Sequence, residues 1–264
     1  MINLNLTGKG VALFSNFTAG ASYALKGFSF IRSPGLRRYF VIPIGLNVAL
    51  FSALSWYGMS RFTALIEKWL PDDGGWWIGA LSIIAAVLIG LTLLVIVFFT
   101  FTLALNLIGA PFNGFLAEKV ERRLNREPTA APGGLQRFLA GFLGSIRGEL
   151  RKYFYFILLG LLVLLVSLIP GINILLAPVL SFILGSWMMV LEYLAYPMGN
   201  HDKHFPEVRR WARSNMMLSL GFGSMVLMLT ITPILNLVAM PAAVAGATLM
   251  WNERREVFGT SGIA

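Results

Sequence analysis

Four long uncharged stretches, separated by short charged segments, form the pattern of hydrophobic and polar positions along the chain. They cover residues 39–60, 74–117, 153–191 and 214–252. About 20 consecutive apolar residues cross the hydrocarbon core of a bilayer as a helix. The first stretch therefore predicts one membrane span at 39–60, whereas each of the other three is long enough for more than one helix.

The second stretch is too long for a single span, and its sequence predicts where the span ends. We expect a second long transmembrane helix over 76–105, followed by a bend through Asn106, Gly109 and Pro111. Proline removes a backbone donor and clashes with the preceding turn of a helix, so it favours a bend. A cytoplasmic helical region rich in charges is then expected over 112–152.

The last two stretches predict apolar helical hairpins over 153–191 and 214–252, each bent at proline. The pattern P-x2-N-x4-P occurs once in each, at 170–178 and at 233–241. The arm at 153–169 would be about 25 Å long at the helical rise, against a hydrocarbon core of about 30 Å. Two interpretations stay open: re-entrant hairpins that penetrate partway around a polar path, or pairs of thin, tilted spans.

Residues 11–32 predict an amphipathic helix at the N-terminal end. Its apolar residues recur at spacings of three and four, which places them on one helical face. They are Phe14, Phe17, Ala21, Ala24, Phe28 and Ile31. Such a helix lies along the membrane surface or packs on the bundle, and an ordinary core-facing helix is the open alternative.

Composition and charge agree with a membrane protein. Of the 264 residues 57% are hydrophobic and 12% are charged, whereas a soluble domain carries about 25% charged residues. The net charge of +9 comes from basic residues in the gaps between apolar stretches, so nucleic-acid binding is not expected. If the last two stretches are hairpins, 19 of the 21 Lys and Arg residues lie on one side. The positive-inside rule makes that side the cytoplasm.

The predicted fold is therefore an all-α, multi-pass integral membrane protein forming one membrane domain over 1–264. It has two long transmembrane helices, two proline-bent hairpins and an N-terminal amphipathic helix. The N-terminus and most basic loops are expected in the cytoplasm.

Groups suited to enzymatic chemistry are scarce, so we expect no catalytic residue, no metal and no cofactor. The acidic residues are confined to the charged gaps, and the phosphate-cradling and hydrolase motifs are absent. The absence of cysteine excludes disulfides and cysteine-based metal sites. His201 and His204 lie three residues apart beside Asp202, a pattern that favours a solvated turn over a metal site.

The segment 33–38 carries the best candidate for anion binding. Ser33 is a preferred N-cap and Pro34 a favoured first helical residue, so a helix is predicted to begin here. Its free backbone N–H groups and two guanidinium groups would suit a tetrahedral oxyanion. The candidate site residues are Gly35, Leu36, Arg37 and Arg38. The alternative is that the two arginines are ordinary anchors at the membrane edge.

Five segments in this order resemble the CysZ family of bacterial sulfate permeases. They are SPGLRRYFVIP, APFNGFLAEKVERRL, LIPGINILLAPV, YPMGNH and TPILNLVAMPAAVAGATLMW. The resemblance implies an oligomeric inner-membrane protein that brings sulfate into the bacterial cytoplasm for cysteine biosynthesis. It also implies two long spanning helices with shorter helices that penetrate partway. The sulfate-binding motif of that family corresponds here to Gly35, Leu36, Arg37 and Arg38.

We therefore expect a sulfate channel or permease without an ATP motor, assembled as a homo-oligomer in the lipid bilayer. The ion path is predicted to be lined by asparagines near the proline bends, namely Asn106, Asn113, Asn173 and Asn236. The alternative function is a non-transporting membrane scaffold or a regulatory subunit of another anion transporter. A binding motif on the cytoplasmic face would be an exit or regulatory site, and the entry site stays unassigned.

Overall fold

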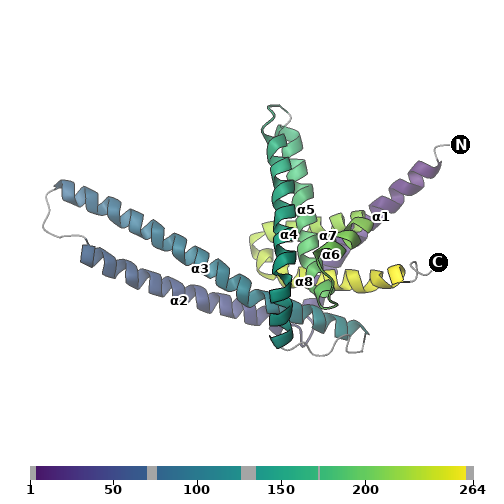
Figure 1. The fold of residues 1–264 in the computed structure, drawn as a ribbon, viewed down its shortest axis with the longest axis horizontal. Helices are drawn as coiled ribbons and strands as arrows, with labels where there is room; N and C mark the ends of the chain where they lie inside the picture. Colours follow the sequence, from purple (N-terminus) through teal and green to yellow (C-terminus); the bar gives the residue numbers. More distant parts are fainter. Residues whose placement is uncertain (1–3, 70–75, 126–134, 172, 260–264) are drawn as a thin grey trace. The chain divides into compact units, whose positions relative to one another are not determined.

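The computed structural model describes residues 4–69, 76–125, 135–171 and 173–259, and within these residues the chain is almost entirely helical with no strand (Figure 1). The helices of this part are α1 (Leu4–Ile31), α2 (Arg38–Trp69), α3 (Trp76–Asn125), α4 (Leu135–Ser167), α5 (Asn173–Gly199), α6 (Phe205–Ser214), α7 (Met216–Ile231) and α8 (Pro233–Gly259). The predicted all-α fold is confirmed.

Three helices in the described part of the chain are long and apolar enough to cross a membrane. Their spans are Ile83–Thr100 in α3, Leu150–Ser167 in α4 and Asn173–Gly199, which is α5. Helices α6 and α7, bent by 106° at a short break, add a fourth if they form one broken span. The protein is thus a multi-pass membrane protein, as predicted. The predicted span 39–60 lies within α2, where several side chains are outside the description, and it stays a prediction.

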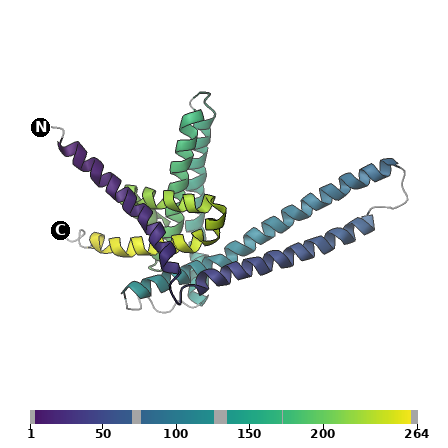
Figure 2. The same cartoon turned by 180° about the vertical axis from the view of Figure 1, so that it is seen from behind.

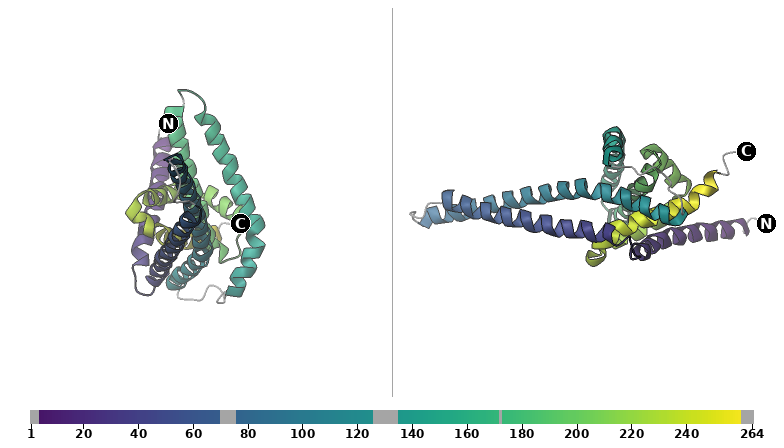
Figure 3. Two further views of the ribbon diagram at one scale, coloured as in Figure 1. Left: turned by 90° about the vertical axis from the view of Figure 1, so that its left-hand side faces the viewer. Right: turned by 90° about the horizontal axis from the view of Figure 1, so that it is seen from below.

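The chain divides into two compact units, and the smaller one covers Val41–Phe112. In it, α2 and the first part of α3 lie side by side, as the views in Figures 1 and 3 agree. Small residues bring the two helices close: a Cβ on Gly58 would lie 3.2 Å from Val97, and one on Gly90 would lie 3.4 Å from Phe62. Large apolar side chains on this pair are exposed, as suits contact with lipid.

Helix α3 does not stop where the sequence predicted a bend. It is helical without interruption through 106–111 and ends at Asn125. Its last part, from Asn113 onwards, belongs to the larger unit, which also contains Met1–Phe40 and the rest of the chain to Ala264. The apolar sequence favours continued helix on both sides of Pro111, so the proline does not end it.

Helix α1 packs across α7 and α8 in the larger unit (Figure 2). The contact is between backbones. A Cβ on Gly20 would lie 2.0 Å from the carbonyl oxygen of Leu218, and one on Gly221 would lie 1.9 Å from that of Phe17. Small residues at helix crossings let backbones approach in membrane proteins, where no hydrophobic effect draws helices together.

The buried face of α1 differs in part from the predicted one. Ala24 and Ile31 are buried as predicted, but Phe14 is 71% exposed. The buried stripe runs instead through the glycines that contact α7 and α8, because only small residues fit there. From about Gly20 onwards α1 therefore packs on the bundle, one of the two predicted arrangements.

Helices α4 and α5 lie side by side and are joined by a turn containing Pro170 and Gly171 (Figures 1 and 2). Gly171 adopts a positive φ of 83°, which glycine tolerates without strain. About midway along the pair, the indole nitrogen of Trp187 donates to the Tyr155 hydroxyl at 3.0 Å. The turn end is exposed: Leu165 is 62% and Ile174 81% accessible.

The two copies of the proline pattern behave alike. Pro170 lies in the turn between α4 and α5, and Pro233 is the first residue of α8, directly after a break at Thr232. The second prolines, Pro178 and Pro241, lie inside helices. The first proline of each pattern therefore marks a helix boundary, as predicted, and the second does not. How these helix pairs enter and leave the membrane stays a prediction.

Candidate anion-binding site

The predicted binding segment is a turn between α1 and α2, and a helix does not begin at Pro34. The backbone N–H of Leu36 donates to the carbonyl of Ser33 at 3.2 Å, which closes a four-residue turn. Proline at its second position and Gly35 at its third, with φ of 85°, are the signature of a type II turn. The predicted helix start is wrong because Pro34 and Gly35 favour this turn, and α2 begins only at Arg38.

The Ser33 hydroxyl, which was predicted to cap the N-terminus of α2, instead bonds to the C-terminal end of α1. Ser33 Oγ donates to the carbonyl oxygen of Phe30 at 2.6 Å, one of the terminal carbonyls that α1 leaves without a helical partner. Leu36 is 1% exposed and packs in the core, so it anchors the turn rather than contacting an anion with its side chain. Its N–H is also engaged in the turn, so it is not the free donor that was predicted.

Both predicted arginines are exposed, Arg37 just before α2 and Arg38 at its first residue. Arg37 folds back onto the end of α1, where its Nε donates to the carbonyl oxygen of Arg32 at 2.7 Å. Arg38 is the first residue of α2. The structure therefore brings Arg37 and Arg38 next to the turn, at its surface.

A cavity of about 290 Å³ lies against the turn, entirely within the larger unit. Its lining residues are Pro34, Gly35, Leu36, Lys119, Arg122 and Arg123. The predicted residues Gly35 and Leu36 thus line a cavity, whereas Arg37 and Arg38 are not among its lining residues. The positive charge of the lining comes from the last turns of α3 instead.

Arg123 joins α3 to the turn. Its Nη1 donates to Ser33 Oγ at 2.8 Å and to the carbonyl oxygen of Pro34 at 3.0 Å. The same guanidinium lies 5.8 Å from the centre of the Phe30 ring. These contacts fix the position of the turn relative to the basic end of α3.

Arg122 is held by a different partner. Its Nη2 forms an ion pair with Glu118 one turn earlier on α3. Its Nε is buried and has no hydrogen-bond partner among the described residues. A second cavity of about 200 Å³ adjoins these side chains, with Lys119 and Phe115 completing its lining. Arg122 thus lines both cavities with one donor unsatisfied.

The signal for these α3 residues was present in the sequence EKVERR. Lys119, Arg122 and Arg123 are spaced three and four apart, which places them on one face of a helix. They were interpreted only as charges that hold the chain on the cytoplasmic side. Their approach to the turn comes from packing between segments almost 90 residues apart, which periodicity does not reveal.

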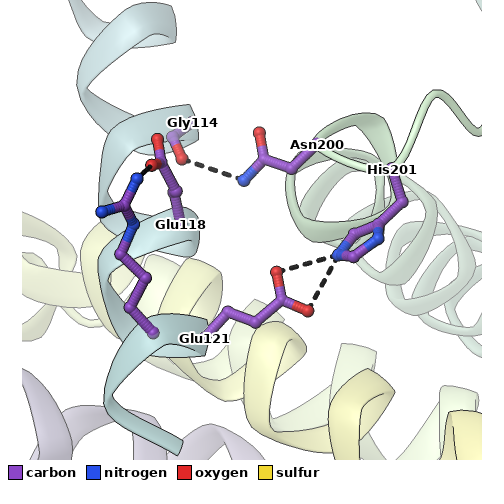
Figure 4. A network of polar contacts seen from close by, with 6 residues as sticks. Gly114, Glu118, Glu121, Asn200 and His201 are labelled. Carbon is purple, nitrogen blue, oxygen red and sulfur yellow. Dashed lines mark hydrogen bonds and ion pairs between the residues drawn. The ribbon is translucent and has the colours of Figure 1, made fainter. Parts of the chain in front are cut away.

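A buried polar network lies near this site, between α3 and the end of α5 (Figure 4). The carboxylate of Glu121 is 2% exposed, and its two oxygens lie 2.8 and 2.9 Å from Nε2 of His201. The Asn200 amide donates to the carbonyl of Gly114 at 3.2 Å. The His201 ring also lies 4.7 Å from the Trp251 ring.

This network corrects the interpretation of the histidines and acids. His201 was predicted to lie in a solvated turn, but it partners a buried carboxylate because α3 packs beside it. Glu121 shows that not every acid stays in solvent. His204 is exposed at the start of α6. Among the described residues, no group of three or more His, Cys, Asp and Glu side chains gathers to hold a metal.

The structure separates the four predicted pore asparagines. Asn113 is buried, and its amide contacts the sulfur of Met240 at 3.2 Å. Asn236 is exposed one helical turn before Met240, so these two asparagines lie near the same part of α8. Asn173 begins α5 at the turn end of the α4–α5 pair, away from α8 (Figure 1). The side chain of Asn106 lies outside the described residues, and a pore-lining role stays a prediction for all four.

Comparison with known proteins identifies the family. A sequence model described as "Sulfate transporter CysZ/Etoposide-induced protein 2.4" matches residues 23–241. The chain belongs to this CysZ family. A protein of Pseudomonas paraeruginosa named sulfate transporter CysZ is 40% identical over 233 residues, which cover 88% of this chain and 94% of the relative.

Other members of the CysZ family are similarly close. A protein of the same name from Pseudomonas fluorescens is 37% identical over 240 residues, covering 90% of this chain and 94% of the relative. One from Pectobacterium atrosepticum is 34% identical over 239 residues, covering 89% and 85%. The region matched to the CysZ family contains both the turn and the cavity-lining part of α3.

Proposed function

We propose that the protein transports sulfate across the bacterial inner membrane into the cytoplasm, where the sulfur serves cysteine biosynthesis. The observation that carries this proposal is the cavity beside Gly35, lined by Lys119, Arg122 and Arg123, in a multi-pass member of the CysZ family. Relatives that cover most of the chain bear the name sulfate transporter. The protein acts as a transporter, not as an enzyme.

The chemistry of the cavity suits a doubly charged oxyanion. Sulfate loses part of its hydration when it enters a protein, and cationic donors replace that hydration with charge-assisted hydrogen bonds. Guanidinium groups offer a planar fork that matches two oxygens of a tetrahedral anion. Arg37 and Arg38, exposed beside the turn, attract the anion toward the cavity from the aqueous side.

Transport requires no nucleotide motor in this proposal, because the sequence contains no phosphate-cradling motif. The N-terminus and the basic segments lie in the cytoplasm, as the distribution of Lys and Arg favours. The site then stands at the cytoplasmic end of the path, as an exit or regulatory site. Asn113 and Asn236, which lie near one part of α8, are the better pair for the path itself.

The chain works as a homo-oligomer in this proposal. Large apolar side chains are exposed on several helices, on the α4–α5 pair among others. Contiguous apolar surface of this kind contacts lipid or another copy of the protein. Chemical cross-linking in native membranes, followed by size analysis in detergent, measures the number of copies.

Sulfate flux into proteoliposomes tests the proposed function. Purified wild-type protein is expected to admit labelled sulfate without ATP, and the double variant Arg37→Ala, Arg38→Ala to admit it several-fold more slowly. The matched control is Arg209→Ala, Arg210→Ala on α6, which removes two adjacent arginines outside the cavity lining. Absence of wild-type flux together with absence of sulfate binding would instead support a scaffold or regulatory subunit of another anion transporter.

A further inference from the structure

We infer that the oxyanion site has two sides, and that Lys119 and Arg122 of α3 bind the anion while Arg123 positions the turn opposite them. This inference rests on the proposed function, because it assigns the residues of that function's binding site. It adds three residues outside the segment 33–38 that the sequence indicated.

The lining of the cavity supports the first part. On one side lie Pro34, Gly35 and Leu36, which contribute backbone and apolar surface but no charge. The charged groups of the lining are Lys119, Arg122 and Arg123. At about 290 Å³, the space is several times the roughly 30 Å³ that one water molecule occupies in the liquid. A tetrahedral oxyanion with part of its hydration shell therefore fits.

The position of Arg122 supports the second part. Its side chain is 33% exposed and lines both cavities, so its guanidinium group can contact an anion there. The ion pair with Glu118 engages Nη2 and holds the guanidinium in place. The Glu118 carboxylate offsets one of the three positive charges of Lys119, Arg122 and Arg123. The net charge of the side chains that line the cavities therefore stays positive.

The contacts of Arg123 assign it a different role. Its Nη1 is already engaged by Ser33 Oγ and the Pro34 carbonyl oxygen. Ser33 does not line the cavity, yet it links Arg123 to the end of α1 through its own bond to Phe30. Arg123 therefore acts as a positioning residue that sets the distance between the turn and the α3 cations.

The first experiment measures sulfate binding by calorimetry with the full chain in a zwitterionic detergent. Lys119→Gln and Arg122→Gln are each expected to weaken binding about tenfold, which corresponds to the loss of one charge-assisted hydrogen bond. The matched control is Arg213→Gln, an exposed arginine of α6 outside the cavity. Arg122→Lys retains the positive charge but not the planar guanidinium group, so it is expected to lose less sulfate affinity than Arg122→Gln. Such partial retention would show that the variants at this position are folded.

A second pair of variants tests the positioning role without changing any charge. Ser33→Ala removes one acceptor of Arg123 and is expected to weaken sulfate binding several-fold with little change in melting temperature. The control is Ser29→Ala, whose hydroxyl donates to a carbonyl of α1 but contacts no cavity residue in the described structure. Equal affinity in Ser33→Ala and wild type would overturn the positioning role.

The outcomes separate this inference from the proposed function. Wild-type flux together with unchanged sulfate binding in Lys119→Gln and Arg122→Gln would overturn the inference alone. Sulfate binding that depends on Lys119 and Arg122 but is not accompanied by flux would overturn the proposed function and leave the two-sided site intact. Failure of the wild type to bind any sulfate would overturn both.

An anionic lipid headgroup presents the same phosphate-like chemistry, so the titration is repeated in nanodiscs. One set contains phosphatidylcholine only, and the other contains phosphatidylcholine with phosphatidylglycerol. Equal sulfate affinity in the two sets supports the free anion as the ligand. Sulfate binding that disappears with phosphatidylglycerol would assign the cavity to a headgroup and overturn the assignment to sulfate.

Discussion

Two parts of the larger unit differ in how their helices are held together. Where α1 crosses α7 and α8, glycines place backbone against backbone, and a Cβ on Gly221 would come within 1.9 Å of a carbonyl oxygen. In the outer half of the α4–α5 pair, large apolar side chains such as Leu162 and Leu165 are more than half exposed. The comparison shows that the packed framework is built where side chains are smallest. The most apolar surfaces are left for lipid or another copy.

Gly221→Ala is expected to have the largest effect, because its Cβ would overlap the carbonyl oxygen of Phe17. We expect destabilisation of about 3 kcal/mol, the upper end for overpacking an interior. The measurement is the melting temperature of purified protein in detergent, followed by size-exclusion chromatography. Gly160→Ala on α4, where a Cβ meets nothing within 4 Å, is the control and should be neutral or slightly stabilising. Equal losses in both would remove the distinction between the two parts.

His201→Ala tests the hydrogen bond between Glu121 of α3 and His201, which follows the end of α5. Losing a hydrogen bond to a buried carboxyl group costs about 2 kcal/mol, and Glu121 is 2% exposed. The control is Lys203→Ala, which breaks the exposed pair with Glu207 (3.1 Å) and should cost less than about 0.5 kcal/mol. Thermal unfolding in one detergent measures both, and a smaller effect for His201→Ala than for Lys203→Ala would contradict the prediction.

Tyr23→Phe is expected to have a moderate effect on the α1–α8 contact. The Tyr23 hydroxyl donates to Glu253 at 2.6 Å, and losing a hydrogen bond of this kind costs about 1 kcal/mol. Tyr153→Phe on α4, where the ring is 57% exposed, serves as the control with no expected change. The prediction would be refuted if Tyr23→Phe and Tyr153→Phe lowered the melting temperature by the same amount.

Leu162→Ala is expected to have the smallest effect. Leu162 is 59% exposed on α4, so its side chain contacts detergent rather than packed protein in the isolated chain. We expect a change within about 0.5 kcal/mol. Leu191→Ala, at a fully buried position of α5, should cost about 2–5 kcal/mol. A large loss for Leu162→Ala in purified protein would indicate that another copy covers this surface.

The sequence predicted the all-α membrane fold and two of its helix boundaries because long apolar stretches and prolines are local signals. The helix boundaries at Pro170 and Pro233 follow from proline chemistry at those positions. The continuation of α3 past Pro111 could not be predicted in this way. Whether a single proline ends a helix or is accommodated within it depends on the surrounding packing. Likewise the predicted stripe of α1 combined phenylalanines with Ala21, Ala24 and Ile31 and omitted Gly20 and Gly27, since a glycine carries no hydrophobic signal.

The candidate site was predicted from one side only. Gly35 and Leu36 were identified by motif, and both line the cavity. The backbone conformation of this segment was not predicted correctly, because Ser33 and Pro34 are compatible with both a helix start and a type II turn. Lys119 and Arg122 were missed because contacts between distant segments depend on tertiary packing, and a charged helix at a membrane edge already has a sufficient explanation. His201 was assigned to solvent for the same reason.

If α4 and α5 enter the bilayer as a hairpin, as predicted, the turn that joins them is expected to make the protein sensitive to the thickness of its bilayer. Backbone carbonyls in such a turn need water, headgroups or protein around them, because hydrocarbon offers no hydrogen bonds. The uncharged arm over 153–169 would be about 25 Å long as a helix, slightly less than a hydrocarbon core of about 30 Å. A thicker bilayer leaves the turn short of the far headgroups and favours local thinning or association with a second copy, and a thinner one relieves that mismatch.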